Sequence, residues 1–220
     1  MNVMRTQQER TIYQMNMQIC GGRDCEDNMW PVLEPTDTIP HGLTTFQVST
    51  SYDHPEDFCH FYIDDYRFER IWQTPERYVN VLKRYDGVIA PDFSTYTDMP
   101  YPMQMWNVYR SRALAHYWQQ CGIDVIPNVQ FSDKRSYEWA FDGLPFGATL
   151  ATSSVGVAKR KEWRDAFVEG MEECCRRCEP FQIIAYGKPI EFDALGAMVV
   201  WYENDNDRRM RDARENRTYR

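Results

Sequence analysis

Polar side chains follow the apolar runs of this sequence at several separate places. The run at 87–90, GVIA, leads into Pro-Asp-Phe-Ser, which brings an aspartate and a serine directly after an apolar segment. Carboxylates and hydroxyls in such positions can move protons, hold Mg²⁺ or hydrogen-bond a polar ligand. The side chains that share this placement are Asp65, Asp92, Ser94, Asn128, Ser153 and Tyr186.

These side chains are expected to divide the work of a ligand site. Asp65 and Asp92 are the predicted acid–base residues, and either could also be a ligand for Mg²⁺, the one cofactor that the residue types suggest. The residues predicted to contact the ligand itself are Ser94, Arg110, Asn128, Ser153 and Tyr186. At any single position, capping of the following helix is the simpler explanation. The succession of polar strand ends favours a site.

Arg110 is a candidate because it lies among apolar side chains. In a helical projection of 104–119 it falls in the middle of the apolar face, whereas Arg112 points toward the edge. A charge buried there needs an anionic partner, because an unpaired buried charge is costly. Two explanations are open: a structural ion pair with a carboxylate such as Asp65 or Asp92, and recognition of an anionic ligand.

The elements that must position these residues alternate along the chain. Strand-like apolar runs occur at 44–50, 58–63, 87–90, 123–129, 148–152, 181–186 and 197–202. Helical patterns separate most of the later runs, at 75–85, 104–119, 134–141 and 159–177. This alternation predicts an α/β fold with a mostly parallel sheet and helices on both faces; an incomplete β/α barrel is the alternative. In a parallel sheet the carboxyl ends of the strands meet at one edge, where ligands bind.

Composition divides the chain into three parts. Residues 1–40 are rich in residues that break regular structure and are predicted to form an irregular arm. Residues 41–202 form the predicted α/β domain. Residues 203–220 are highly charged and almost devoid of apolar side chains, so a solvated tail is expected.

Overall composition excludes several classes of protein. The formal net charge of −8 argues against binding of nucleic acid by bulk electrostatics, although the arginine-rich tail could supply a local basic patch. The sequence has no apolar run long enough to span a membrane and no leader-like start, so a cytoplasmic protein of a bacterial host without membrane contact is expected. Seven cysteines, an odd number, fit reduced thiols in a cytoplasm.

Two weaker motifs are further candidates for ligand sites. The small-residue turn at 152–159, TSSVGVAK, could bind an anion through backbone amides, but it lacks the glycine and lysine spacing of a P-loop. A zinc site would draw on Cys20, Cys25, Cys175 and Cys178. The helical projection instead places Cys174 and Cys178 on an apolar face, so no metal site is predicted from the cysteines.

Long strings in the middle of the chain are specific enough to be compared with known families. They are FYIDDYRFERIWQTPERY (61–78), GVIAPDFSTYTDMP (87–100), QMWNVYRSRALAHYWQ (104–119), GIDVIPNVQFSDKRSYEWAFDGLP (122–145) and IIAYG (183–187). Together they resemble an uncharacterised family of bacteria, phages and mobile elements, catalogued as a domain of unknown function. The resemblance implies a phage or mobile-element origin and carries no activity.

Two functions from different classes follow from these observations. The first is an accessory protein of a phage or mobile element whose strand-end cleft binds a small anionic ligand, with a nucleotide or sugar phosphate as the favoured class, and which could be catalytic. The second is a non-catalytic interaction or anti-defence protein that binds a host protein or sequesters a nucleotide signal. Abundant aromatic residues and the arginine-rich tail motivate the second, since Tyr, Trp and Arg dominate interface hot spots.

Overall fold

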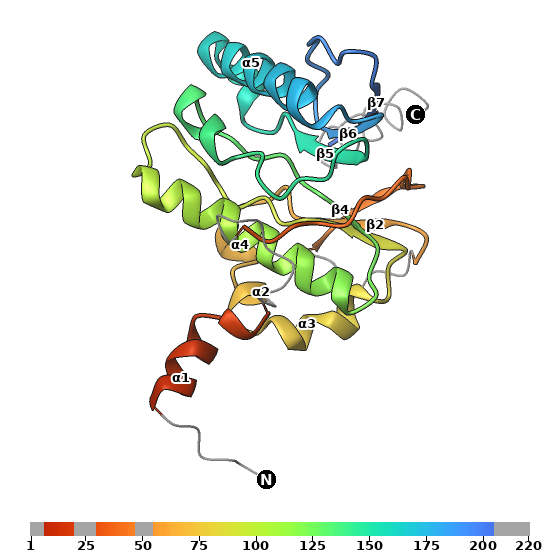
Figure 1. The fold of residues 1–220 in the computed structure, drawn as a ribbon. Helices are drawn as coiled ribbons and strands as arrows, with labels where there is room; N and C mark the ends of the chain where they lie inside the picture. The colour runs from red at the N-terminus through yellow and green to blue at the C-terminus, as the bar shows by residue number, and fades with distance from the viewer. Residues whose placement is uncertain (1–6, 20–29, 47–54, 205–220) are drawn as a thin grey trace, which may run out of the picture.

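Two parallel sheets form the centre of the protein. The computed structural model describes residues 7–19, 30–46 and 55–204 (Figure 1). The first sheet has the order β1-β2-β3-β4, and the second has the order β5-β6-β7. The strands are β1 (Leu43–Thr45), β2 (Phe58–His60), β3 (Gly87–Ile89), β4 (Val125–Ile126), β5 (Thr149–Ser153), β6 (Gln182–Tyr186) and β7 (Met198–Tyr202). All pairings are parallel, so the predicted α/β fold with parallel strands is confirmed.

Helices cover the outer sides of both sheets. The α-helices are α1 (Gln7–Gln14), α2 (Arg70–Gln73), α3 (Pro75–Leu82), α4 (Tyr101–Gln120) and α5 (Lys161–Cys178). Short 3-10 turns are η1 (Met17–Ile19), η3 (Asp65–Arg67), η4 (Lys134–Glu138) and η5 (Val157–Lys159). Thus 134–141, predicted as a helix, begins as a 3-10 turn, and α1 is helical within the segment predicted to be irregular. Among the described residues no helix has the length and apolar character needed to cross a membrane.

The two sheets are joined at one point and follow chain order. A parallel bridge pairs Asn128, just beyond β4, with Ala151 of β5. The backbone N–H of Val129 donates to the carbonyl of Ala151 at 2.8 Å, and that of Ala151 donates to the carbonyl of Pro127 at 2.8 Å. The described strands therefore succeed one another in space as they do in sequence. An open doubly wound sheet reverses its order at a switch point, whereas chain order is the arrangement of the β/α-barrel alternative.

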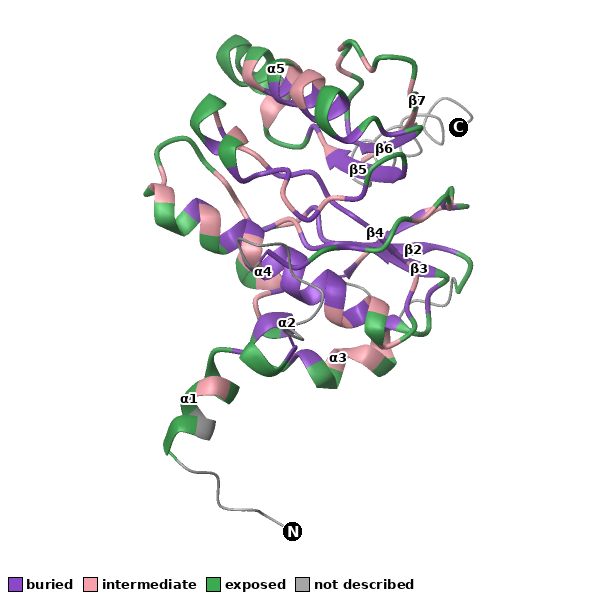
Figure 2. Ribbon diagram, viewed as in Figure 1, coloured by how far each residue is buried: buried purple, intermediate pink, exposed green. Residues whose placement is uncertain are grey.

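Apolar side chains fill three main layers of this arrangement. Helices α2, α3 and α4 pack on the first sheet through a cluster that includes Phe61, Leu114 and Trp118. Helix α5 packs on the second sheet through Phe167 and Met171. Figures 1 and 2 show these helices on opposite outer sides, with the buried strands between them. Between the sheets lies a third cluster, with members from every strand: Leu43, Phe58, Ile89, Ile126, Ala151, Ile184 and Val200.

The segment before β1 covers the amino ends of the later strands. The carbonyl of Thr36 accepts a hydrogen bond from the N–H of Thr149 at 2.8 Å, where β5 begins. The hydroxyl of Thr38 donates to Oδ2 of Asp124, just before β4, at 2.6 Å. Because these contacts occupy the amino edge, the carboxyl edge of the sheets is the side that remains for a ligand.

Arg112 of α4 is a fully buried structural cation. The helical projection placed it toward the edge of the apolar face, but its exposed fraction is 0%. Its guanidinium donates to the carbonyls of Asn128 at 2.8 Å, Ala140 at 3.1 Å and Asp142 at 3.4 Å. Burial lowers its pKa to about 10, so it stays charged at neutral pH. Arg112 therefore ties the end of β4 to the loop after η4.

Arg112→Lys should destabilise the protein by about 2–4 kcal/mol, because the donors of a lysine lie on a single nitrogen, which cannot reach the three carbonyls that Nε, Nη1 and Nη2 of Arg112 reach, and buried acceptors are left unsatisfied. Urea unfolding of the full chain measures the loss. The matched control is Arg164→Lys, a conservative change at an exposed position of α5, which should leave stability almost unchanged. Equal stability of the two variants would contradict the structural role of Arg112.

Candidate functional site

A cleft lies at the carboxyl ends of the strands. Its volume is about 1210 Å³, and its walls come from segments at or just beyond each strand end. Residues that line it, one per strand in order, are Thr45, Tyr62, Asp92, Gln130, Ser153, Tyr186 and Asn204. Chain topology thus gathers side chains that are far apart in the sequence. Four of the predicted site residues line this cleft, namely Asp92, Ser94, Ser153 and Tyr186.

Asp92 is held at the cleft wall by a short relay of hydrogen bonds. The side-chain amide of Asn128 donates to Oδ1 of Asp92 at 2.8 Å. The Oδ1 of Asn128 in turn accepts a hydrogen bond from the Tyr62 hydroxyl at 3.0 Å. Burial raises the pKa of Asp92 from 3.8 to about 7, and the Asp65 carboxylate adds to this while the Asn128 hydrogen bond opposes it. Both protonation states are therefore populated near neutral pH, as acid–base chemistry requires.

Tyr62 is a site residue that the sequence did not single out. Its ring stacks on that of Tyr186 with centroids 5.3 Å apart, and Tyr186 in turn contacts the ring of His60 at 4.3 Å. Burial, with smaller effects of Asp92 and Tyr186, raises the pKa of Tyr62 well above its usual value. Tyr62 therefore remains a neutral donor. The sequence feature that could have identified Tyr62 is the alternation in FCHFYI, which places Phe58, His60 and Tyr62 on the same face of the strand.

Asp65 supports the site from behind rather than lining the cleft. Its Oδ2 accepts a hydrogen bond from the backbone N–H of Ser94 at 3.0 Å, and its Oδ1 accepts one from the Ser94 hydroxyl at 2.8 Å. The carbonyl of Ser94 accepts a further hydrogen bond from the Asn107 amide at 2.6 Å. The position of Asp65 thus suits an anchor of the loop after β3, and its acid–base role stays a prediction.

Arg110 is likewise engaged by the protein itself. Its guanidinium donates to both carboxylate oxygens of Glu69, at 2.7 and 2.9 Å, and to Oδ1 of Asn107 at 2.7 Å. It also lies over the ring of Phe93, 3.9 Å from the centroid. Of the two explanations left open, the geometry fits the structural ion pair, with Glu69 as the partner instead of Asp65 or Asp92. Arg110 does not line the cleft, so other cations must be considered there.

Two other arginines lie at the cleft. Arg67 follows β2 and forms an ion pair with Asp64, 3.2 Å apart. Arg160 directly precedes α5 and lies 4.7 Å over the ring of Trp163. The amino end of α5 carries a partial positive charge from its backbone dipoles, which adds to the charge of Arg160. The sequence feature that could have identified Arg160 is the basic run at 159–161, at the end of the small-residue turn. The turn itself contributes Ser153 and Gly156 to the cleft.

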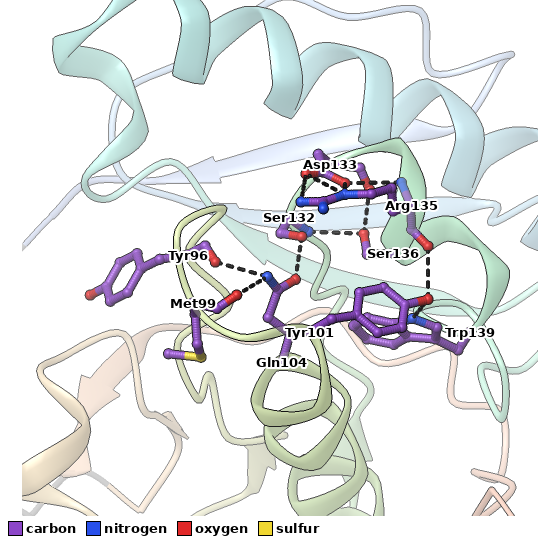
Figure 3. Close-up of polar contacts among 9 residues, drawn as sticks. All are labelled: Tyr96, Met99, Tyr101, Gln104, Ser132, Asp133, Arg135, Ser136 and Trp139. Atoms are coloured by element: carbon purple, nitrogen blue, oxygen red, sulfur yellow. Dashed lines mark hydrogen bonds and ion pairs between the residues drawn. The ribbon is translucent and has the colours of Figure 1, made fainter.

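Side-chain hydrogen bonds join the two loops that form one wall of the cleft (Figure 3). The Gln104 amide donates to the carbonyls of Tyr96 at 3.0 Å and Met99 at 2.8 Å, and its Oε1 accepts from the Ser132 hydroxyl at 2.5 Å. The N–H of Ser132 donates to the Ser136 hydroxyl at 3.0 Å. Gln104 is 1% exposed, so these bonds are shielded from water and fix the loop after β3 against the loop after β4.

Potential metal ligands lie elsewhere. Cys174, Cys175 and Cys178 are buried free thiols in the second core layer, and Cys20 and Cys25 fall outside the described residues. Within the described ranges, the set of three side chains close enough to share an ion is His41, Glu56 and Asp57. These precede β1 and β2, at the edge opposite the cleft. Asp92, a predicted Mg²⁺ ligand, is not part of such a set.

Parallel strands in chain order, with a polar cleft at their carboxyl ends, place the protein in the α/β class. More specifically, the chain belongs to the family described as Domain of unknown function (DUF4417), whose model matches residues 26–203. The Gene 1 protein of Mycobacterium phage L5 is 39% identical over 161 residues, which cover 72% of this chain and 70% of that protein.

A second phage protein shows a similar relation. The Gene 1 protein of Mycobacterium phage D29 is 37% identical over 161 residues, and the match spans 72% of this chain but 60% of that relative. No solved structure matches the chain significantly. The predicted resemblance is confirmed, and the relatives support a phage accessory protein.

Asp92→Asn should change how stability depends on pH. An aspartate ionises near 3.8 when unfolded but near 7 in this fold, so the unfolded chain releases its proton first. Wild-type stability, relative to the variant, should fall as pH rises from about 4 to about 7 and then level off. Urea unfolding from about pH 5 to about pH 8 measures this, with Asp98→Asn, an exposed aspartate of the same cleft wall, as the control. Parallel pH profiles of wild type and Asp92→Asn would refute the assignment.

Gln104→Ala should loosen the cleft wall, because the two loops lose the side chain that joins them. Hydrogen exchange of the amides at 95–99 and 131–133 should accelerate about tenfold, which corresponds to a local loss of ~1.4 kcal/mol. Gln73→Ala is the control, since this glutamine is exposed on α2. Unchanged exchange in both loops would show that the wall is held by other contacts.

Proposed function

We propose that the protein binds a small anionic ligand, a nucleotide or a sugar phosphate, in the strand-end cleft. The observation that carries this proposal is the convergence of seven strand ends on one cleft of about 1210 Å³ that contains Asp92. Cleft volumes of this order accommodate small molecules, and ligands of parallel α/β proteins bind at this edge. The polar groups at the cleft suit a ligand that is itself rich in hydrogen-bonding atoms.

Two arginines at the cleft support an anionic ligand, beside the three aspartates Asp64, Asp92 and Asp98 of the same lining. Arg67 follows β2 and Arg160 precedes α5, so the two guanidinium groups come from different sheets. Guanidinium groups bind phosphate through two parallel hydrogen bonds, and the amino end of a helix favours negative charge. A phosphate near Arg160 would also meet the small-residue turn of Ser153 and Gly156.

Asp92 gives the same cleft a group for acid–base chemistry. Its pKa of about 7 allows it to accept or donate a proton near neutral pH, and the Asn128 and Tyr62 hydrogen bonds hold its orientation. A bound ligand that loses or gains a proton during reaction would find Asp92 as its partner. Ser94, anchored by Asp65, offers a hydroxyl on the same wall.

A protein-binding role has less support in the described part of the chain. The arginine-rich segment at 203–220 that motivates it lies almost entirely outside the described residues. The cleft therefore carries the proposal, and the phage relatives set its context as an accessory protein.

Binding of phosphorylated probes tests the proposal. Full-length protein should be stabilised against heat by at least one of GMP, AMP, ribose 5-phosphate and glucose 6-phosphate, with or without Mg²⁺. Arg160→Ala should weaken the best probe about tenfold by calorimetry, as expected for the loss of one charge-assisted contact of ~1.4 kcal/mol. Arg164→Ala, which removes an exposed arginine one turn further along α5, should not. If none of the four probes stabilises the protein, the proposal is contradicted.

A further inference from the structure

Gln130 has a buried acceptor at the cleft that no described residue satisfies. The residue lies just beyond β4, lines the cleft and is only 3% exposed. Its Nε2 donates to the carbonyl of Phe93 at 2.7 Å. Its Oε1 has no hydrogen-bond partner among the described residues. A buried acceptor without a donor is costly, which makes this oxygen a place where a ligand gains affinity.

The hydrogen bond to Phe93 fixes which way this amide is turned. Because the nitrogen donates to the Phe93 carbonyl, the buried oxygen is the end of the amide that is left for a ligand donor in the cleft that Gln130 lines. Asn128 and Gln130 bond to consecutive residues of the loop after β3, Asn128 to the side chain of Asp92 and Gln130 to the carbonyl of Phe93. Gln130 and Asp92 both line the cleft.

Asp92 contributes a second acceptor beside the first. Its Oδ1 accepts the Asn128 hydrogen bond, whereas Oδ2 receives none within the described part of the chain. The side chain is partly exposed, and it lines the cleft. Two neighbouring acceptors, one of them a carboxylate, suit a ligand edge with two neighbouring N–H donors. A sugar phosphate alone offers hydroxyls but no such edge.

Aromatic side chains at the cleft indicate what carries that edge. Those that line it are Tyr62, Phe93, Tyr96, Phe131, Trp163, Phe167 and Tyr186. Tyr96 and Trp163 are exposed, so their faces are open to stack on a planar heterocycle. Arg160, over the ring of Trp163, supplies a cation for a phosphate attached to such a ring. A planar base at one end and a phosphate at the other is the chemistry of a nucleotide.

We propose that Asp92 and Gln130 form a base-reading subsite that accepts the ring N–H and exocyclic amino group of a guanine nucleotide. This deepens the proposed function and rests on it, because the same cleft must hold the phosphate. Guanine carries two adjacent donors on one edge, which match two acceptors. Adenine offers an acceptor beside its amino group, so one of its contacts is lost. Xanthine has a carbonyl in place of the exocyclic amino group of guanine, so its oxygen would face an acceptor.

A comparison of four probes on the full chain tests the assignment by calorimetry. GMP should bind at least tenfold more tightly than AMP, and more tightly still than ribose 5-phosphate. Agmatine carries adjacent N–H donors on a guanidinium group without a phosphate or a base, and it should bind at least tenfold more weakly than GMP. Equal affinities for GMP and ribose 5-phosphate would overturn the subsite while leaving the proposed function standing. If agmatine bound as tightly as GMP, the proposal that the subsite recognises a nucleobase would be overturned.

Asp92→Asn provides the sharper test, since it replaces one acceptor with an amide that can donate. The variant should lose at least tenfold in affinity for GMP and gain affinity for XMP. A merely structural role of Asp92 would weaken both nucleotides alike, and that result would overturn the proposal.

Gln130→Met is a second variant, which removes the acceptor at similar length and should reduce the preference for GMP over AMP. Its folding is checked by thermal melting, because the Phe93 carbonyl loses its partner. An unchanged preference in folded Gln130→Met would remove Gln130 from the subsite.

Discussion

Asn128 is the point on which the two sheets and the cleft both depend. Its backbone forms the bridge to β5, which joins the sheets, and its carbonyl accepts a hydrogen bond from the buried Arg112. Its side chain meanwhile accepts from Tyr62 and donates to Asp92. The residue is fully buried, so each of these bonds forms in a medium of low dielectric, where leaving one unmade is costly. Asn128 therefore fixes both the junction of the two sheets and the orientation of Asp92, although Asn128 itself does not line the cleft.

This arrangement limits how far burial raises the pKa of Asp92. Burial disfavours its charge, and the Asn128 amide restores part of the solvation that water would have given. The amide cannot rotate freely, because its oxygen is held by Tyr62. Tyr62 in turn is fixed by stacking on Tyr186. A rigid polar support of this kind lets a cleft keep a titratable group in one orientation.

Much of the fold could be predicted because period and length are local properties of the sequence. Each of the seven strands overlaps a predicted apolar run, although β1 begins one residue before its run and β5 ends one residue after its run. β4 is shorter than its run: Pro127 has no N–H to continue the ladder, and Asn128 forms an isolated bridge to β5 instead. The gathering of strand ends also followed from topology alone. The partners of Arg110 and Arg112 did not, because a helical projection shows which face is buried but not which segment covers it. Glu69 and the carbonyls beyond β4 become partners only through tertiary packing. The unsatisfied oxygen of Gln130 is likewise invisible in sequence, since it depends on a bond to Phe93.

The strand order also bears on how the chain reaches this structure. Each described strand pairs with the one that precedes it in the sequence, so a nascent chain leaving the ribosome can add strands one at a time to an existing edge. Pairing of successive strands closes loops of a few tens of residues, as between Val88 and Val125, and these are shorter than pairing of distant strands would require. The segment at 36–38 is the exception, because its partners Asp124 and Thr149 are synthesised much later. The segment at 36–38 would therefore dock late in folding, after the strands that begin at or beside Asp124 and Thr149 have been added.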